Sequence, residues 1–139
     1  MSIVCLLALS IVGQTPIGDP PSLRSQRAVE IKPEPVKLDE KGREIVTIRV
    51  KIKPDYYLYA TPQPDELFMS SEMKLTVRSR DPRTRVDVTY PKGRTLQVRD
   101  FHWAEYEGEI AVVAVVHRAK GDDSPLECTL RFHPMQRGV

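Results

Sequence analysis

Residues 45–60, with the sequence IVTIRVKIKPDYYLYA, constrain the fold more than any other stretch of this chain. Ile48, Val50 and Ile52 alternate with polar residues, and a period of two is typical of a strand that buries one face and exposes the other. A Pro-Asp pair then interrupts the strand, because proline lacks a ladder hydrogen-bond donor and aspartate favours turns. The sequence therefore predicts an amphipathic strand, a bend and a second strand.

The second strand, residues 56–59, is the aromatic run YYLY. Successive side chains of a strand point to opposite faces, so Tyr57 and Tyr59 share one face while Tyr56 and Leu58 share the other. We expect at least one of these pairs to pack in the core. The pair that points outward is a candidate aromatic surface for a partner.

Shorter strand-like segments occur on both sides of this stretch at intervals of roughly ten residues, separated by turn signals, and most of them show the same alternation. They comprise residues 29–38, 73–78, 85–90, 96–98, 110–116 and 126–132. The almost entirely apolar segment 110–116 favours an interior strand covered on both faces, or a packed interface. No segment has a convincing helical pattern. The sequence thus predicts an all-β fold, an antiparallel β-sandwich of about seven to eight strands, with a closed barrel as the alternative.

Residues 99–109, RDFHWAEYEGE, lack this alternation and are predicted to form a loop. They contain the only tryptophan of the chain, Trp103, together with Phe101, His102 and Tyr106. A loop this aromatic either folds back over the core or is exposed for binding, since loops often carry function.

Charge and length narrow the possible functions. The chain has 139 residues, enough for one domain with a real core, and a formal net charge of +2. So small an excess produces no field over the whole molecule that would attract nucleic acid or an anionic membrane. The basic stretch 78–99 is interrupted by aspartates, which favours a solvated sheet face over a phosphate-binding patch.

The N-terminus has the features of an export signal. Residues 3–12 are an uncharged apolar run of the length of a signal-peptide core and too short to span a bilayer. No lysine or arginine precedes Arg24, so an ordinary buried strand or a misassigned start codon is the alternative. We expect a signal-peptide-like segment at 1–13, a flexible leader rich in proline and serine at 14–28, and one domain at 29–139. We therefore expect a periplasmic or secreted protein whose mature chain has no membrane span.

Residues capable of chemistry are sparse. Loss of residues 1–13 would remove Cys5 and leave Cys128, which shares the apolar face of its strand and is predicted to be buried in the core. Serine-nucleophile motifs, glycine-rich phosphate loops and CxxC pairs are absent from the sequence. His102 and its acidic neighbours lack a recognised metal-ligand spacing. We predict no cofactor, no metal site and no catalytic residue.

Several short pieces of sequence occur in a characteristic order between residues 29 and 133. The strand VTIRVKIKPDYYLYA is followed by Tyr90-Pro91-Lys92-Gly93, by Asp100-Phe101, by EYEGE at 105–109 and by a last strand ending Leu130-Arg131-Phe132. In this order they resemble the N-terminal domain of the thiol:disulfide interchange protein DsbD. The resemblance implies an immunoglobulin-like sandwich in an exported compartment. It also implies an aromatic cap loop over two redox-active cysteines, here residues 99–105, with Phe101 or Trp103 as the shielding residue.

The chain departs from this family where the chemistry would occur. Matching the last strand puts Met135 at the position of the first cysteine of the family, and no second cysteine follows. A thioether cannot form a disulfide or carry electrons as a dithiol does. Disulfide reductase activity is therefore not expected from these residues.

Three functions remain open from the sequence. The favoured one is an exported, non-catalytic domain that binds a protein partner in envelope thiol/disulfide systems. Its candidate binding residues are Tyr56, Tyr57, Tyr59, Phe101, His102, Trp103 and Tyr106. The second is a truncated thiol:disulfide interchange domain whose cysteine pair lies beyond this chain. The third is a periplasmic metal- or copper-binding protein that uses His133 and Met135, with Met69 and Met73 as further candidate ligands.

Overall fold

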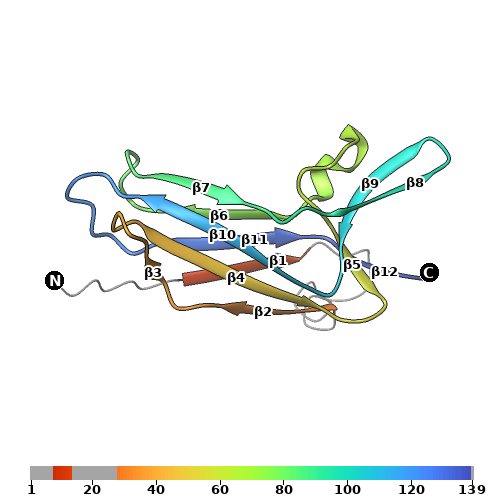
Figure 1. Ribbon diagram of the computed structural model, residues 1–139, viewed down its shortest axis with the longest axis horizontal. Helices are drawn as coiled ribbons and strands as arrows, with labels where there is room; N and C mark the ends of the chain where they lie inside the picture. The colour runs from red at the N-terminus through yellow and green to blue at the C-terminus, as the bar shows by residue number, and fades with distance from the viewer. Residues whose placement is uncertain (1–7, 14–27, 139) are drawn as a thin grey trace.

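The computed structural model of the chain describes residues 8–13 and 28–138, and these form an all-β fold (Figure 1). Its strands are β1 (Ala8–Gly13), β2 (Val29–Pro33), β3 (Lys37–Leu38), β4 (Glu44–Ile52), β5 (Tyr56–Tyr59), β6 (Lys74–Arg78), β7 (Arg85–Thr89), β8 (Arg94–Val98), β9 (Phe101–Tyr106), β10 (Glu109–His117), β11 (Glu127–Phe132) and β12 (Pro134–Gln136). A single 3-10 helix, η1 (Glu66–Ser71), lies among the described residues. The β-sandwich prediction is confirmed, although strands are more numerous than the predicted seven to eight.

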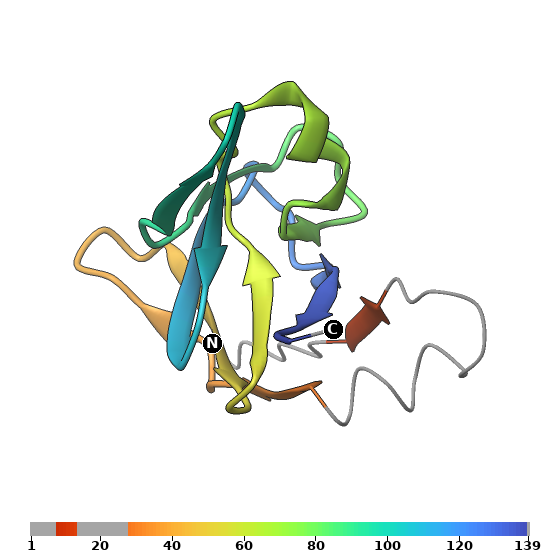
Figure 2. The same cartoon turned by 90° about the vertical axis from the view of Figure 1, so that its right-hand side faces the viewer.

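The strands form three sheets, in the orders β1-β11-β6, β2-β4-β10-β7 with β3 beside β4, and β12-β5-β9-β8. The pairings are antiparallel except for β1 with β11, which run parallel. Viewed end-on, the sheets containing β4 and β11 lie on opposite sides of the interior (Figure 2). All three sheets contribute side chains to one hydrophobic core.

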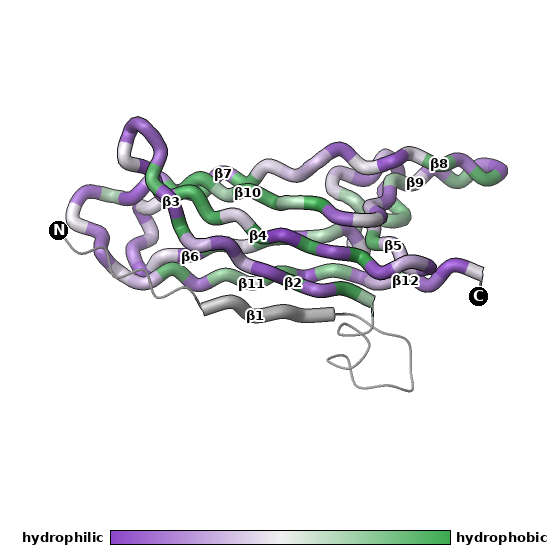
Figure 3. Tube along the Cα trace, turned by 60° about the horizontal axis from the view of Figure 1, so that its bottom comes forward, coloured by the Kyte–Doolittle hydropathy of each residue, from purple (hydrophilic) through white to green (hydrophobic). Residues whose placement is uncertain are grey.

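Strands β4 and β10 form the centre of the core, where Ile48 is paired with Val112. Their alternate side chains are buried, as the period of two in β4 predicts. Hydrophobic and hydrophilic residues alternate along β4 in Figure 3. As predicted, residues 110–116 form an interior strand, since β10 lies between β4 and β7. Its outer face is not fully covered, because Val113 and Val115 remain partly exposed, and the alternative of a packed interface stays a prediction. The outer face is apolar because β-branched residues favour strands even where burial is incomplete.

The prediction of a loop at residues 99–109 is also wrong, because Phe101–Tyr106 forms β9 between β5 and β8. The usual alternation is hidden because large or acidic side chains lie on both faces of this strand. Ala104 and Tyr106 point into the core, while Trp103 and Glu105 lie on the opposite face. A search for alternating polar and apolar residues does not identify a strand of this kind.

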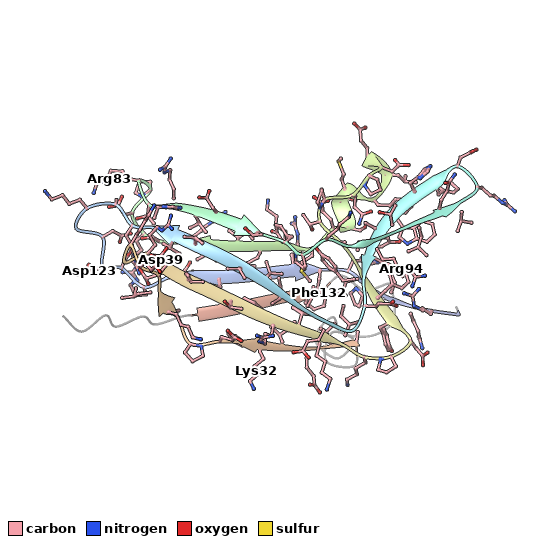
Figure 4. All side chains as sticks on the ribbon, viewed as in Figure 1. Lys32, Asp39, Arg83, Arg94, Asp123 and Phe132 are labelled. Atoms are coloured by element: carbon pink, nitrogen blue, oxygen red, sulfur yellow. The ribbon has the colours of Figure 1, made fainter. Side chains whose placement is uncertain are left out.

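At one end of the sandwich, the buried carboxylate of Asp122 joins two loops, the β6-β7 loop and the β10-β11 loop. Its side chain is 2% exposed and accepts hydrogen bonds from the hydroxyls of Ser79, Thr84 and Ser124. The guanidinium of Arg118 lies 3.4 Å away. The neighbouring Asp123 lies at this end of the molecule, whereas Arg94 lies at the other (Figure 4). Asp122 therefore fixes the loops at the end remote from β8 and β9.

The N-terminal predictions fall largely outside the described residues, which include neither residues 1–7 nor residues 14–27. Within the predicted signal-like segment, β1 lies alongside β11, with Ala8 paired to Glu127 and Gly13 paired to Phe132. Across the described ranges 8–13 and 28–138, no helix has the length and apolarity needed to cross a membrane.

Candidate functional site

The outer face of the sheet β12-β5-β9-β8 gathers the aromatic side chains that the sequence singled out. Tyr59 is paired with Glu105 of β9, and Tyr57 is paired with Met135 of β12. Directly paired residues of an antiparallel sheet lie on the same face, so these four side chains share the outer face. Leu58 points the other way and is fully buried. The bend after β4 therefore directs Tyr57 and Tyr59 outward, and it directs Tyr56 and Leu58 toward the core.

The rings on this outer face contact one another in a chain. Tyr59 lies 5.8 Å from Tyr57 in an edge arrangement and 5.5 Å from Phe68 in a stacked one, measured between ring centroids. Phe68 lies 6.0 Å from Trp103, and the His133 ring lies 6.1 Å from Tyr59. We name the set Tyr57, Tyr59, Phe68, Trp103 and His133 the aromatic face. All five residues are only partly buried. The aromatic face is therefore partly accessible, and each of its rings packs against another.

A buried glutamine holds the segment that carries Phe68. Gln63 is 4% exposed, and its amide donates to the carbonyl oxygens of Ala60 and Ala104 at 2.7 and 2.6 Å. Its side-chain oxygen accepts from the backbone N–H of Ala104 at 3.0 Å. Helix η1 then begins after Asp65, whose carboxylate accepts from the Leu67 N–H. These bonds fix η1 against β9, so that Phe68 stacks on the aromatic face.

Close packing joins the β8-β9 hairpin to β5. At Gly93 a Cβ atom would lie 2.4 Å from the Cβ of Ala60, so this approach requires glycine. The Tyr106 hydroxyl donates to the Pro91 carbonyl at 2.7 Å and accepts from the Thr61 N–H at 3.2 Å. The hairpin that carries Trp103 is therefore anchored on its core side.

One buried carboxylate lies beneath the aromatic face. The Glu105 side chain is 0% exposed, and its Oε2 accepts from the Trp103 indole N–H at 3.1 Å. Its Oε1 accepts from Nη2 of Arg137, which also lies 3.0 Å from Oε2 of Glu107. The Arg137 guanidinium carbon is 4.7 Å from the centroid of the Tyr57 ring. A buried negative charge is thus matched by a cation that also contacts an aromatic ring.

Burial shifts the pKa of two groups of the aromatic face in the direction that favours their neutral forms. Burial, with the neighbouring Tyr59 as the second cause, raises the pKa of Tyr57 to about 12. Burial lowers the pKa of His133, and its Nδ1 has no hydrogen-bond partner. The hydrogen bond from Arg137 to Glu105 raises the pKa of that arginine. Near pH 7 the aromatic face therefore offers neutral rings beside one compensated ion pair.

The structure separates the predicted binding residues into two groups. Tyr57, Tyr59 and Trp103 lie together in the aromatic face. Phe101 is on the same side of β9 as Trp103 by strand alternation, and 48% of it is exposed.

The other predicted residues point away from the aromatic face. His102 is exposed on the opposite side of β9, paired with Gln97 of β8. Tyr56 packs against the core, and Tyr106, at 2% exposure, lies within it. These three side chains do not contribute to the aromatic face.

Sequence reasoning missed Phe68, Glu105 and Arg137 as members of this site. A signal for Glu105 exists, because Trp103, Glu105 and Glu107 follow a period of two. Arg137 gives no such signal. Its role depends on pairing between β12 and β5, which are separated by most of the chain.

The methionines of the copper-binding hypothesis lie in different surroundings. Met135, at the position matched to the first cysteine of the DsbD-like pattern, pairs with Tyr57 and is partly buried. Met73 is buried in the core, whereas Met69 is 48% exposed on η1. Residues 8–13 and 28–138 contain no group of three or more His, Cys, Asp or Glu suited to a metal ion.

The predicted burial of Cys128 is confirmed, since this residue is 1% exposed between the sheets. In a Cys5→Ser variant, we expect Cys128 to react with a thiol reagent only after unfolding, because the reagent cannot reach the core. Thiol titration of the native and the denatured protein measures this. Rapid reaction of the native protein would contradict it.

Comparison of the chain with known proteins finds no matching family model, no matching curated protein and no matching solved structure.

Proposed function

We propose that this chain is an exported, non-catalytic domain that binds a protein partner through the aromatic face. The observation that carries the proposal is the continuous contact of partly exposed tyrosine, phenylalanine and tryptophan rings beside Arg137. Tyrosine, tryptophan and arginine are the residues most enriched where protein interfaces gain their binding energy. Rings already held by their neighbours lose little conformational freedom on binding, which favours affinity.

The resemblance to the DsbD N-terminal domain supports a partner in envelope thiol/disulfide systems. In the proposed role the chain contributes recognition and no electron transfer, since Met135 cannot act as a dithiol and Cys128 is buried. A partner that contacts the outer face of β5 and β9 would leave this thiol in the core.

Trp103→Ala is expected to weaken partner binding by about 10-fold to 30-fold, the usual effect of removing a central interface tryptophan. His102→Ala is the matched control, because His102 is adjacent in β9 and exposed on the opposite side. Affinity capture from an envelope fraction, with wild type and both variants, identifies the partner. Titration with the purified partner then gives each Kd.

The expected partner is captured by wild type and by His102→Ala but much less by Trp103→Ala. Thermal unfolding of the variants verifies that Trp103→Ala remains folded at the capture temperature. Equal capture by all three proteins would refute a role for the aromatic face.

A further inference from the structure

Strand β12 and the residue that follows it close one edge of the sheet that carries the aromatic face. β12 has three residues and is bonded to β5 on one side alone, with Pro134 paired to Leu58 and Gln136 paired to Tyr56. The Arg137 N–H extends the ladder by donating to the Asp55 carbonyl at 2.7 Å. So short an edge strand contributes few backbone bonds, and such segments open at low free energy.

The groups that receive Arg137 form a cradle suited to a guanidinium. Both oxygens of Glu105 accept N–H bonds, one from Trp103 and one from Arg137. The Tyr57 ring lies against the guanidinium, and Glu107 accepts from it at the rim. A planar, weakly hydrated cation fits a carboxylate and a ring face better than an ammonium does.

The difference in burial between the two charges shows which partner can be exchanged. The Glu105 carboxylate is 0% exposed, whereas the Arg137 side chain is 37% exposed. A buried carboxylate without a cation is strongly unfavourable, so the cradle requires a positive group whenever the sheet is formed. The cradle does not specify which chain supplies this cation, because the cation follows the edge strand β12, which has no strand on its other side.

We propose that the edge of β5 and the Glu105 carboxylate form a binding site for an arginine on an extended segment of the partner protein, and that β12 with Arg137 occupies this site in the isolated chain. The partner segment pairs with β5 in place of β12, a common mode of peptide recognition. This inference rests on the proposed function, because the cradle adjoins the aromatic face at Tyr57 and Trp103.

The test uses the full chain with Arg137→Ala and two peptides of the sequence PMQR, one natural and one with citrulline in place of arginine. Citrulline has nearly the same shape as arginine but no charge. Trp103, the only tryptophan of the chain, reports binding by its fluorescence because its indole N–H bonds to Glu105. Arg78→Ala, at an exposed position in β6, is the matched control for loss of an arginine.

We expect Arg137→Ala to have a lower Tm than Arg78→Ala and to bind the arginine peptide at least about 10-fold more tightly than the citrulline peptide, since only the former supplies a cation. Wild type and Arg78→Ala should bind the arginine peptide far more weakly, because Arg137 fills the cradle. If Arg137→Ala is unfolded alone, the arginine peptide should restore its circular dichroism signal. The double variant Glu105→Gln/Arg137→Ala should lose the preference for arginine.

Absence of peptide binding by Arg137→Ala, or equal binding of both peptides, would overturn the inference. If the peptide test fails in this way but Trp103→Ala still loses partner capture, the proposed function stands, because the capture experiment does not alter Arg137. Equal capture by Trp103→Ala, with arginine selectivity retained, would instead refute the aromatic face as the partner-binding surface.

Discussion

Replacing Asp122 by alanine is expected to lower the free energy of unfolding by about 3 kcal/mol, because it removes one buried partner of a charged network. The carboxylate, 2% exposed, is the common acceptor for Ser79, Thr84 and Ser124 and lies 3.4 Å from the Arg118 guanidinium. Without it, three hydroxyls lose an acceptor and the partly buried guanidinium of Arg118 loses one of its counter-charges. Chemical denaturation measured by circular dichroism gives the change.

Asp123→Ala is the matched control, since Asp123 is the next residue and is exposed. We expect this control to change stability by less than about 0.5 kcal/mol, as is usual for surface sites. Equal stabilities of Asp122→Ala and Asp123→Ala would show that the network is not stabilising.

The pH dependence of the Asp122→Ala effect has a defined sign. Burial alone would raise the pKa of Asp122, but hydrogen bonds from Ser124, Ser79 and Thr84 outweigh it and hold the pKa well below its usual value. A lowered pKa in the folded state adds stability above the unfolded pKa of about 3.9, and this stability is lost as pH falls further. The difference between wild type and Asp122→Ala should therefore be full at neutral pH and shrink below about pH 4.

The sequence predicted the features of this fold that depend on local alternation. The inward residues of β4 and the burial of Cys128 follow from a period of two, because one face of a strand must leave water. The same rule paired Tyr57 with Tyr59, and burial of Leu58 then decided which pair faces out. These predictions needed no knowledge of which strands are neighbours.

Features that depend on long-range contacts could not be predicted in this way. Strand β9 was mistaken for a loop because its outer face carries Trp103 and Glu105, and Glu105 is buried only because Arg137 covers it from another strand. The carboxylate of Asp122 is buried for a similar reason, since its partners Ser79 and Thr84 lie 43 and 38 residues away. A charged residue in a turn reads as exposed until its distant partners are known.

Phe132→Ala is expected to destabilise the protein by about 3 to 5 kcal/mol, the range for deleting a fully buried phenylalanine side chain. Phe132 is the last residue of β11 and is 1% exposed in the core. One residue separates it from β12. The substitution removes apolar burial and leaves a cavity that the two sheets cannot close without moving. Urea or guanidinium unfolding of the variant measures the loss.

Phe101→Ala makes the same chemical change at a position that is 48% exposed on β9, so it separates the effect of burial from that of residue type. We expect Phe101→Ala to change stability by less than about 1 kcal/mol, because its ring already contacts water. Similar losses in the two variants would contradict a core located between the β4 and β11 sheets. A large loss in Phe132→Ala alone would show that the interior of the sandwich stabilises the fold more than the β8-β9 hairpin does. The outer aromatic side chains would then be available for binding, because the fold does not depend on them.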